Sequence, residues 1–133
     1  MIILVLRTDQ NIAQLFLYNQ DKIIAHYEWL SEHQLALDLN KKIANFLNKN
    51  QKKLTDLSGL IVFTGPGSFT GLRIGISLMN ALSYGLNIPI VGTSSIIDDS
   101  WINEGINRLI NGYNDKIVRP IYDQPIRTTQ PKK

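Results

Sequence analysis

The chain has 133 residues, a net charge of +3, and ordinary shares of apolar (44%) and charged (19%) residues, so we expect one globular domain. It contains no cysteine, which excludes a disulfide framework, a thiolate nucleophile and a zinc–sulfur site. No apolar run approaches the roughly 20 residues of a membrane-spanning helix, and the opening apolar run, residues 2–6, is too short for the core of a signal peptide. We therefore expect a cytoplasmic protein with no membrane partner.

The first part of the chain predicts three strands and a helix. Short apolar runs at residues 2–6, 12–18 and 23–29 are separated by polar turns, which is typical of an antiparallel meander. Apolar residues then recur at helical spacing from about residue 32 to residue 48. Ser31 is the expected N-cap of this helix.

The central stretch, residues 59–76, predicts a buried strand, a glycine-rich turn and the start of a second helix. The strand runs from Leu60 to Phe63, an apolar run of good strand formers. The helix is expected from about residue 71 to residue 86, with Ser68 or Thr70 as its cap.

The second helix is apolar nearly all round its circumference, so it needs cover on more than one side. One side is expected to pack on the sheet, and the other on a second helix or a second protein. Gly71 and Gly75 lie one turn apart, where a neighbouring backbone can approach closely.

The last predicted elements are a strand at residues 88–92 and a third helix. The strand should be parallel to the central one, because the helix between them completes a β-α-β unit. The third helix is expected through residues 96–102, capped by one of residues 93–95. Gly105 and Gly112 interrupt the pattern beyond it.

The element order predicts an α/β fold with a mixed five-stranded sheet. Three antiparallel strands followed by helix, strand, helix, strand and helix match one lobe of the actin-like (ASKHA, ribonuclease H-like) fold by analogy of element order. We expect this lobe to cover residues 1–117. Residues 118–133, rich in proline and polar residues, are expected to form an extended tail.

The glycine-rich turn is a candidate anion or nucleotide site, because a glycine loop at a helix N-terminus can cradle a phosphate. It lacks the lysine of a Walker A loop and the glycine spacing of a dinucleotide fingerprint. We favour a structural turn without a cofactor, and keep ATP or ADP binding as the alternative. The residues of this candidate site are Gly65, Gly67, Ser68, Thr70 and Arg73.

Other chemistry-bearing residues favour a surface role. His26 and His33 are seven residues apart, unlike the three or four residues between metal ligands on a helix. Nothing in the local sequence makes Ser68 and His33 a nucleophile and base. A further group of acidic residues is expected on a solvated helix face: Asp98, Asp99 and Glu104.

Basic residues gather after the first helix and at the end of the chain. They can attract RNA phosphates, but no aromatic-interleaved RNA motif accompanies them in the sequence, so a solvated surface is favoured. These residues are Lys41, Lys42, Lys49, Lys52, Lys53, Arg127, Lys132 and Lys133.

Two segments closely resemble the TsaB (YeaZ) family. These are Gly65-Pro66-Gly67-Ser68-Phe69-Thr70-Gly71-Leu72-Arg73-Ile74-Gly75 and the later stretch from Gly85 to Ser95. Residues 118–127 look like the proline–tyrosine segment near the family's C-terminus. The resemblance implies an actin-like lobe from the non-catalytic partner subunit of the bacterial machinery that makes threonylcarbamoyladenosine in tRNA.

The chain departs from this family's pattern in two ways. Arg7-Thr8 stands where the family has an aspartate–threonine pair, and in the wider fold that aspartate organises a nucleotide's metal and phosphates. We also expect the chain to lack nearly all of the family's second lobe, and with it the cleft between the lobes. Both departures favour a scaffold over an enzyme.

The resemblance implies a protein that binds and activates a catalytic TsaD-type threonylcarbamoyltransferase subunit, with a TsaE-type ATPase completing the assembly. It also implies a possible homodimer through the same helices, and contact with tRNA only through the complex. The alternative is a nucleotide-binding ATPase or kinase-like module that uses the glycine loop. The predicted interface residues are Leu35, Leu39, Gly71, Leu72, Gly75, Ile76 and Met79.

Overall fold

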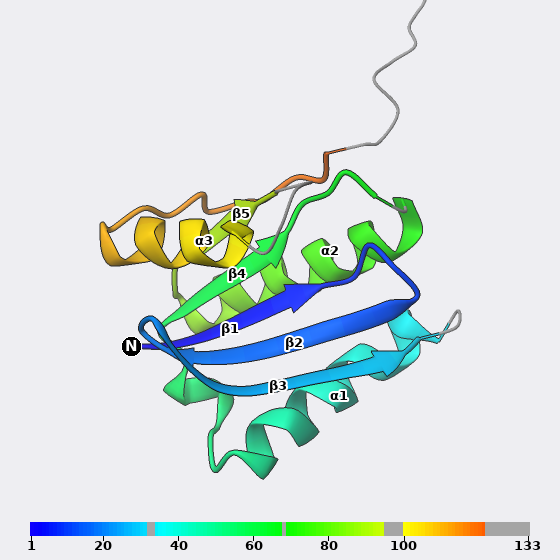
Figure 1. Cartoon of the computed structure of the whole chain (residues 1–133), viewed down its shortest axis with the longest axis horizontal. Coiled ribbons are helices and arrows are strands. Elements are labelled where there is room, and N and C mark those ends of the chain that lie inside the picture. Colours follow the sequence, from blue (N-terminus) through cyan, green and yellow to red (C-terminus); the bar gives the residue numbers. More distant parts are fainter. Residues whose placement is uncertain (32–33, 68, 95–99, 122–133) are drawn as a thin grey trace, which may run out of the picture.

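The computed structural model describes residues 1–31, 34–67, 69–94 and 100–121. The chain forms one five-stranded sheet in the order β3-β2-β1-β4-β5, with helices on both faces (Figure 1). The predicted α/β class, the mixed sheet and the actin-like order of elements are confirmed. The elements are β1 (Ile2–Arg7), β2 (Ile12–Asn19), β3 (Lys22–Leu30), α1 (Leu35–Lys49), η1 (Leu54–Asp56), β4 (Gly59–Phe63), α2 (Phe69–Leu86), β5 (Ile90–Thr93) and α3 (Ser100–Ile110).

The sheet combines an antiparallel half with a parallel half. β1, β2 and β3 pair antiparallel as the predicted meander, with Val5 of β1 opposite Phe16 of β2. β4 pairs parallel with both β1 and β5, as the β-α-β unit requires. β4 is buried along its whole length, because it lies inside the sheet and helices cover both of its faces.

The two faces of the sheet carry different helices. α1 and α2 lie side by side on one face, and α3 lies on the other, over β4 and β5 (Figure 1). The Phe63 ring of β4 meets the Trp101 ring of α3 edge-on, with 5.2 Å between their centroids. The core therefore has two layers, one on each side of the sheet.

Gly105 does not interrupt the third helix, contrary to the prediction. It lies inside α3 and is buried. A Cβ on Gly105 would lie 2.8 Å from two side-chain carbons of Ile61 on β4, so the missing side chain lets the helix approach the sheet closely. α3 ends just before Gly112, whose φ of 86° is a left-handed conformation.

The predicted cap of the first helix is wrong, and two of the alternative caps of the other helices are excluded. α1 begins at Leu35 with Gln34 at the cap position, and the Ser31 hydroxyl instead donates to the Asn11 carbonyl at 3.1 Å. Thr70 lies within α2 rather than before it. Thr93 belongs to β5, although its hydroxyl donates to the Trp101 carbonyl at 2.9 Å. Ser94 directly follows β5 and stays a candidate cap. The other candidate caps, Ser68 and Ser95, lie outside the described residues, as do residues 96–99 of the predicted third helix.

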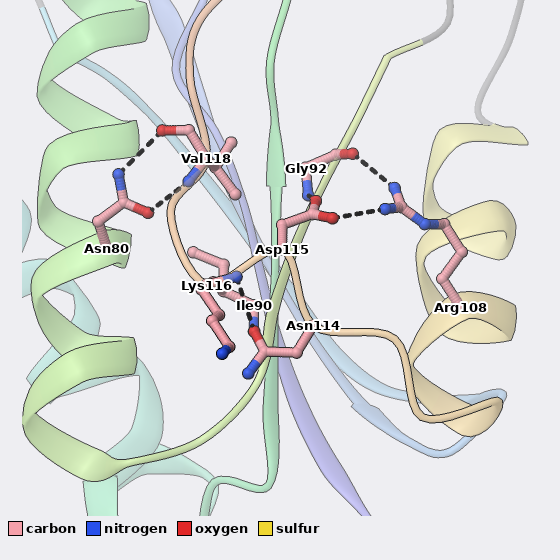
Figure 2. A network of polar contacts seen from close by, with 8 residues as sticks. All are labelled: Asn80, Ile90, Gly92, Arg108, Asn114, Asp115, Lys116 and Val118. Atoms are coloured by element: carbon pink, nitrogen blue, oxygen red, sulfur yellow. Dashed lines mark hydrogen bonds and ion pairs between the residues drawn. The ribbon is translucent and has the colours of Figure 1, made fainter.

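The chain after α3 runs along the outer edge of β5 (Figure 2). The Asp115 N–H donates to the Ile90 carbonyl at 2.8 Å, and the Asp115 carboxylate accepts the Gly92 N–H at 2.8 Å. Arg108 of α3 donates to the Gly92 carbonyl and to the Asp115 carboxylate, at 2.9 and 2.7 Å. Asn114 accepts the Ile90 N–H at 3.1 Å. The outward backbone groups of Ile90 and Gly92 are thus occupied, which blocks pairing with another chain there.

The start of the predicted tail is packed on the lobe. Val118 is buried, and the Asn80 side chain on α2 donates to its carbonyl and accepts its N–H, at 3.0 and 2.9 Å (Figure 2). The Ile121 N–H donates to the Thr64 carbonyl at 2.7 Å. The predicted boundary between residues 117 and 118 therefore falls inside a segment that contacts both α2 and the end of β4.

Among the helices of the described residues, none has the length and apolar content that a membrane crossing requires.

Candidate functional site: the glycine turn and the α1–α2 groove

The glycine turn after β4 packs against its own chain. A Cβ on Gly65, whose φ is 106°, would meet the Ile121 carbonyl oxygen at 2.6 Å, and a Cβ on Gly67 would lie 3.1 Å from a carboxylate oxygen of Asp9. The two glycines therefore admit other parts of the same polypeptide. This geometry favours the structural role of the turn.

Asp9, which the sequence analysis did not single out, lies beside this turn. Its carboxylate is buried and accepts two hydrogen bonds from Arg7, at 2.6 Å from Nε and 3.2 Å from Nη2. The Arg7 guanidinium also lies 4.0 Å from the Phe63 ring centroid, a cation–π contact. Because the Arg7 guanidinium is already paired with Asp9, it is not available to neutralise a phosphate at the turn.

The described residues of the predicted anion site have different surroundings. Gly65 and Gly67 face the chain's own backbone and Asp9, whereas Arg73 is exposed on α2 and lines the groove between α1 and α2. Thr70 is exposed in the first turn of α2, and Ser68 lies outside the described residues. The anion site formed by these residues together stays a prediction.

The start of α2 is locked onto the end of β1 through Thr8. The Thr8 hydroxyl donates to the Gly71 carbonyl at 2.7 Å. A Cβ on Gly71 would overlap the Thr8 carbonyl oxygen, and one on Gly75 would overlap the Thr8 hydroxyl. The close approach expected at these two glycines is thus made by Thr8 of the same chain.

Most of the predicted interface residues belong to the chain's own core. Five of the seven side chains are no more than 5% exposed: Leu35, Leu39, Leu72, Ile76 and Met79. They contribute to the core cluster on the α1–α2 side of the sheet. The prediction of an interface at these residues stays untested, and Leu39 also lines the groove described next.

The outer surface of the helix pair carries a groove between α1 and α2. Its volume is about 360 Å³. Ile74 and Leu78 of α2 are half-buried at its floor, while Asn40 of α1 and Ser77 of α2 are exposed at its sides. Its full lining is Ala36, Leu39, Asn40, Arg73, Ile74, Ser77 and Leu78. The groove is thus lined by both apolar and polar side chains.

The remaining candidates that the structure describes, His26 and Glu104, lie on different elements. His26 of β3 stacks on Phe16 with 4.4 Å between ring centroids, and its Nε2 lies 3.4 Å from the Glu28 carboxylate. No group of three His, Asp or Glu side chains in the described ranges is close enough to hold a metal. Glu104 is exposed on α3. His33, Asp98 and Asp99 lie outside the described residues.

The basic residues after the predicted first helix divide between exposed and half-buried positions. Lys41, Lys49 and Lys53 are exposed, and Lys42 and Lys52 are half-buried. Lys42 and Lys49 line one small pocket together with aromatic side chains. The basic residues of the predicted tail, Arg127, Lys132 and Lys133, lie outside the described residues.

Comparison with known proteins places the chain in a family. Residues 23–98 match the model of the family described as TsaD, tRNA N6-adenosine threonylcarbamoyltransferase. The chain is 30% identical over 111 residues to the tRNA threonylcarbamoyladenosine biosynthesis protein TsaB of Escherichia coli strain K12, covering 81% of this chain and 48% of that protein. It is 33% identical over 124 residues to TsaB of Bacillus subtilis strain 168, covering 92% and 50%. The chain belongs to the TsaB (YeaZ) family.

A solved structure supports the same fold. YeaZ from Pseudomonas aeruginosa matches with a TM-score of 0.66 and 22% sequence identity, over 71% of this chain and 44% of that one. The chain spans about half the length of the TsaB relatives it matches. The resemblance seen in the glycine-rich segment is confirmed, and the matched region corresponds to one lobe of the actin-like fold.

Proposed function

We propose that this chain is a non-catalytic scaffold subunit in the biosynthesis of threonylcarbamoyladenosine in tRNA. It binds a catalytic TsaD-type transferase subunit through the α1–α2 groove and activates it, and a TsaE-type ATPase completes the assembly. The observation that carries the proposal is the match to TsaB proteins over 81% and 92% of this chain. The family model that matches carries the name of the transferase itself, which supports a partner built on a related lobe.

The groove suits a helical partner. Half-buried Ile74 and Leu78 offer apolar surface on successive turns of α2. An amphipathic helix can pack its own apolar stripe against residues at this spacing. Small or polar side chains at the sides, Ala36 and Ser77, allow a close approach. A second copy of this chain could present the same surface, so the groove also accounts for a homodimer in the absence of the transferase subunit.

The glycine turn supports a structural rather than a nucleotide-binding role. Asp9 occupies the space beside Gly67 and is already paired with Arg7. The turn instead fixes the start of α2, because Gly71 and Gly75 seat that helix on Thr8. In this proposal the turn does not contact the partner. It fixes the position of α2, so that α2 packs beside α1 and forms the groove that the partner binds.

Co-purification with the TsaD-type subunit of the same organism tests the proposal. Ser77→Arg places a long charged side chain in the groove at an exposed position, so the fold should tolerate it. We expect this variant to weaken the complex at least about tenfold, the effect of losing a well-packed interface contact. Asn103→Arg is the matched control, because it adds the same side chain at an exposed position of α3.

Two results would contradict the proposal. One is the absence of a complex between the wild-type chain and the transferase subunit. The other is a complex that Ser77→Arg and Asn103→Arg affect equally, which would move the interface away from the groove.

A further inference from the structure

The flank of α1 that faces β3 carries a basic surface separate from the α1–α2 groove. Residues 39–55 contain five lysines and no acidic residue. Lys42, Asn45 and Lys49 follow one another at spacings of three and four residues, so they share one side of the helix. Ala36 and Asn40, which line the groove, lie on the other side. A partner in the groove therefore leaves this flank uncovered.

Aromatic side chains of β3 hold one of these lysines in place. The Lys42 ammonium lies 3.2 Å from the Tyr27 hydroxyl, and 5.6 and 5.7 Å from the centroids of the Tyr27 and Trp29 rings. Tyr27 stacks on Trp29 with 5.5 Å between centroids, and Phe46 of α1 extends the stack at 6.3 Å. The ammonium is thus positioned before any ligand arrives, which reduces the entropy lost on binding.

These groups surround a small hollow of about 90 Å³ lined by Tyr27, Lys42, Asn45, Phe46 and Lys49. Its polar groups are two ammonium ions, an amide and a phenol, which can all donate hydrogen bonds. Asp38 lies one turn before Lys42 on the same side of the helix and is the nearest acidic residue on α1. The charge at the hollow remains positive, so it suits a ligand group that is anionic and only accepts hydrogen bonds.

We propose that this flank, defined by Tyr27, Lys42, Asn45 and Lys49, contacts the phosphate backbone of a structured RNA directly. A phosphate has the required charge and accepts hydrogen bonds from lysine and amide groups. Lys41, Lys52 and Lys53 extend the positive field around the hollow. The identity of that RNA as tRNA rests on the proposed function, but the contact itself rests on this geometry. An RNA is favoured over an acidic protein because the TsaB relatives are named for a tRNA pathway.

The contact is tested by the binding of a fluorescently labelled tRNA transcript to this chain alone. Binding is measured by fluorescence polarisation at salt concentrations from about 50 to about 300 mM, where phosphate contacts make the affinity strongly dependent on salt. The Lys42→Gln/Lys49→Gln double variant should bind about tenfold more weakly or worse, and its log–log salt slope should fall by about 1.5 to 2. Lys42→Arg/Lys49→Arg keeps both positive charges. Its affinity for tRNA should be within about twofold of the wild-type affinity, because the charge of a side chain mainly determines how strongly it binds phosphate.

The matched control removes two charges elsewhere. Lys116→Gln/Arg119→Gln changes exposed residues of the segment after α3 and should leave the affinity and the salt slope unchanged. Equal losses in the control and flank variants, or no loss in the flank variant, would overturn the proposal. So would displacement of the tRNA by polyglutamate at equal charge concentration, which would indicate an acidic protein instead.

The same variants separate this contact from the scaffold role. Lys42→Gln/Lys49→Gln should still co-purify with the TsaD-type subunit, because the groove is untouched. A chain that binds tRNA but forms no transferase complex would contradict the proposed function alone. If the chain forms the complex but its affinity for tRNA is the same in wild type and in Lys42→Gln/Lys49→Gln, the RNA contact alone is contradicted.

Discussion

Replacing Gly75 with alanine tests how α2 is seated on the sheet. A Cβ at this position would overlap the Thr8 hydroxyl and lie 3.1 and 3.2 Å from Thr8 Cγ2 and Cβ. Rotation of Thr8 cannot relieve the overlap freely, because its β-carbon carries two heavy atoms and its hydroxyl donates to the Gly71 carbonyl. Thr8 is also buried, so the cost falls on the packing between β1 and α2.

The expected change in the free energy of unfolding has three contributions. Overpacking costs about 1–3 kcal/mol, and losing the Thr8 hydrogen bond costs about 1 kcal/mol. Against these, alanine stabilises a helix interior by about 1 kcal/mol relative to glycine. We therefore expect Gly75→Ala to lower the free energy of unfolding by about 1–3 kcal/mol.

Gly85→Ala is the matched control in the same helix. No heavy atom lies within 4 Å of a Cβ at Gly85, so this variant should be unchanged or more stable by up to about 1 kcal/mol. Urea unfolding followed by the fluorescence of the buried Trp29 and Trp101 measures both variants. If the Gly75→Ala protein is as stable as Gly85→Ala, Thr8 does not restrict the space at position 75 as described above. Adding Thr8→Ala should recover part of the loss, as a positive coupling energy between contacting sites.

Three further predictions test other parts of the account. Gly105→Ala should destabilise the protein by about 1 kcal/mol or more in the same unfolding assay, because its Cβ would press on Ile61; a stabilised variant would show that α3 can move away from the sheet. Asn80→Ala removes both hydrogen bonds to the Val118 backbone and should lower stability by about 1–3 kcal/mol, with faster hydrogen exchange at Val118; unchanged exchange would mean that the segment is held elsewhere. Calorimetry with magnesium and ATP should give no heat of binding at millimolar nucleotide, because Asp9 fills the space beside Gly67 and is already paired with Arg7; saturable binding would restore the nucleotide-binding alternative.

The sequence was enough to predict the sheet and its helices. The alternation of the meander and the β-α-β order carried the topology, because these patterns are local in the chain. Such patterns did not predict which residues of α2 are buried against the sheet. A helix that is apolar nearly all round does not reveal which stripe faces the sheet, so buried Leu72 and Met79 were predicted as interface residues, whereas Ile74 and Leu78 line the groove.

Contacts between distant segments were the features that the sequence did not predict. Asp9 lies beside Gly67, and Asn114 and Asp115 bond to β5, yet each is an ordinary polar loop residue in the sequence. The aromatic partners of Lys42 are equally remote, since Tyr27 and Trp29 belong to β3. A search for aromatic residues within the basic segment itself could not find them. Such pairings become visible only when strand and helix are placed side by side.

The most direct test of the scaffold role is a reconstituted modification assay. The TsaD-type subunit and the TsaE-type ATPase of the same organism are incubated with tRNA and the threonylcarbamoyl donor, and threonylcarbamoyladenosine is quantified with and without this chain. The scaffold role predicts that the modified nucleoside forms efficiently only when the chain is present. It also predicts that Ser77→Arg removes this stimulation and that Asn103→Arg preserves it. Equal formation of the nucleoside with and without the chain would contradict it.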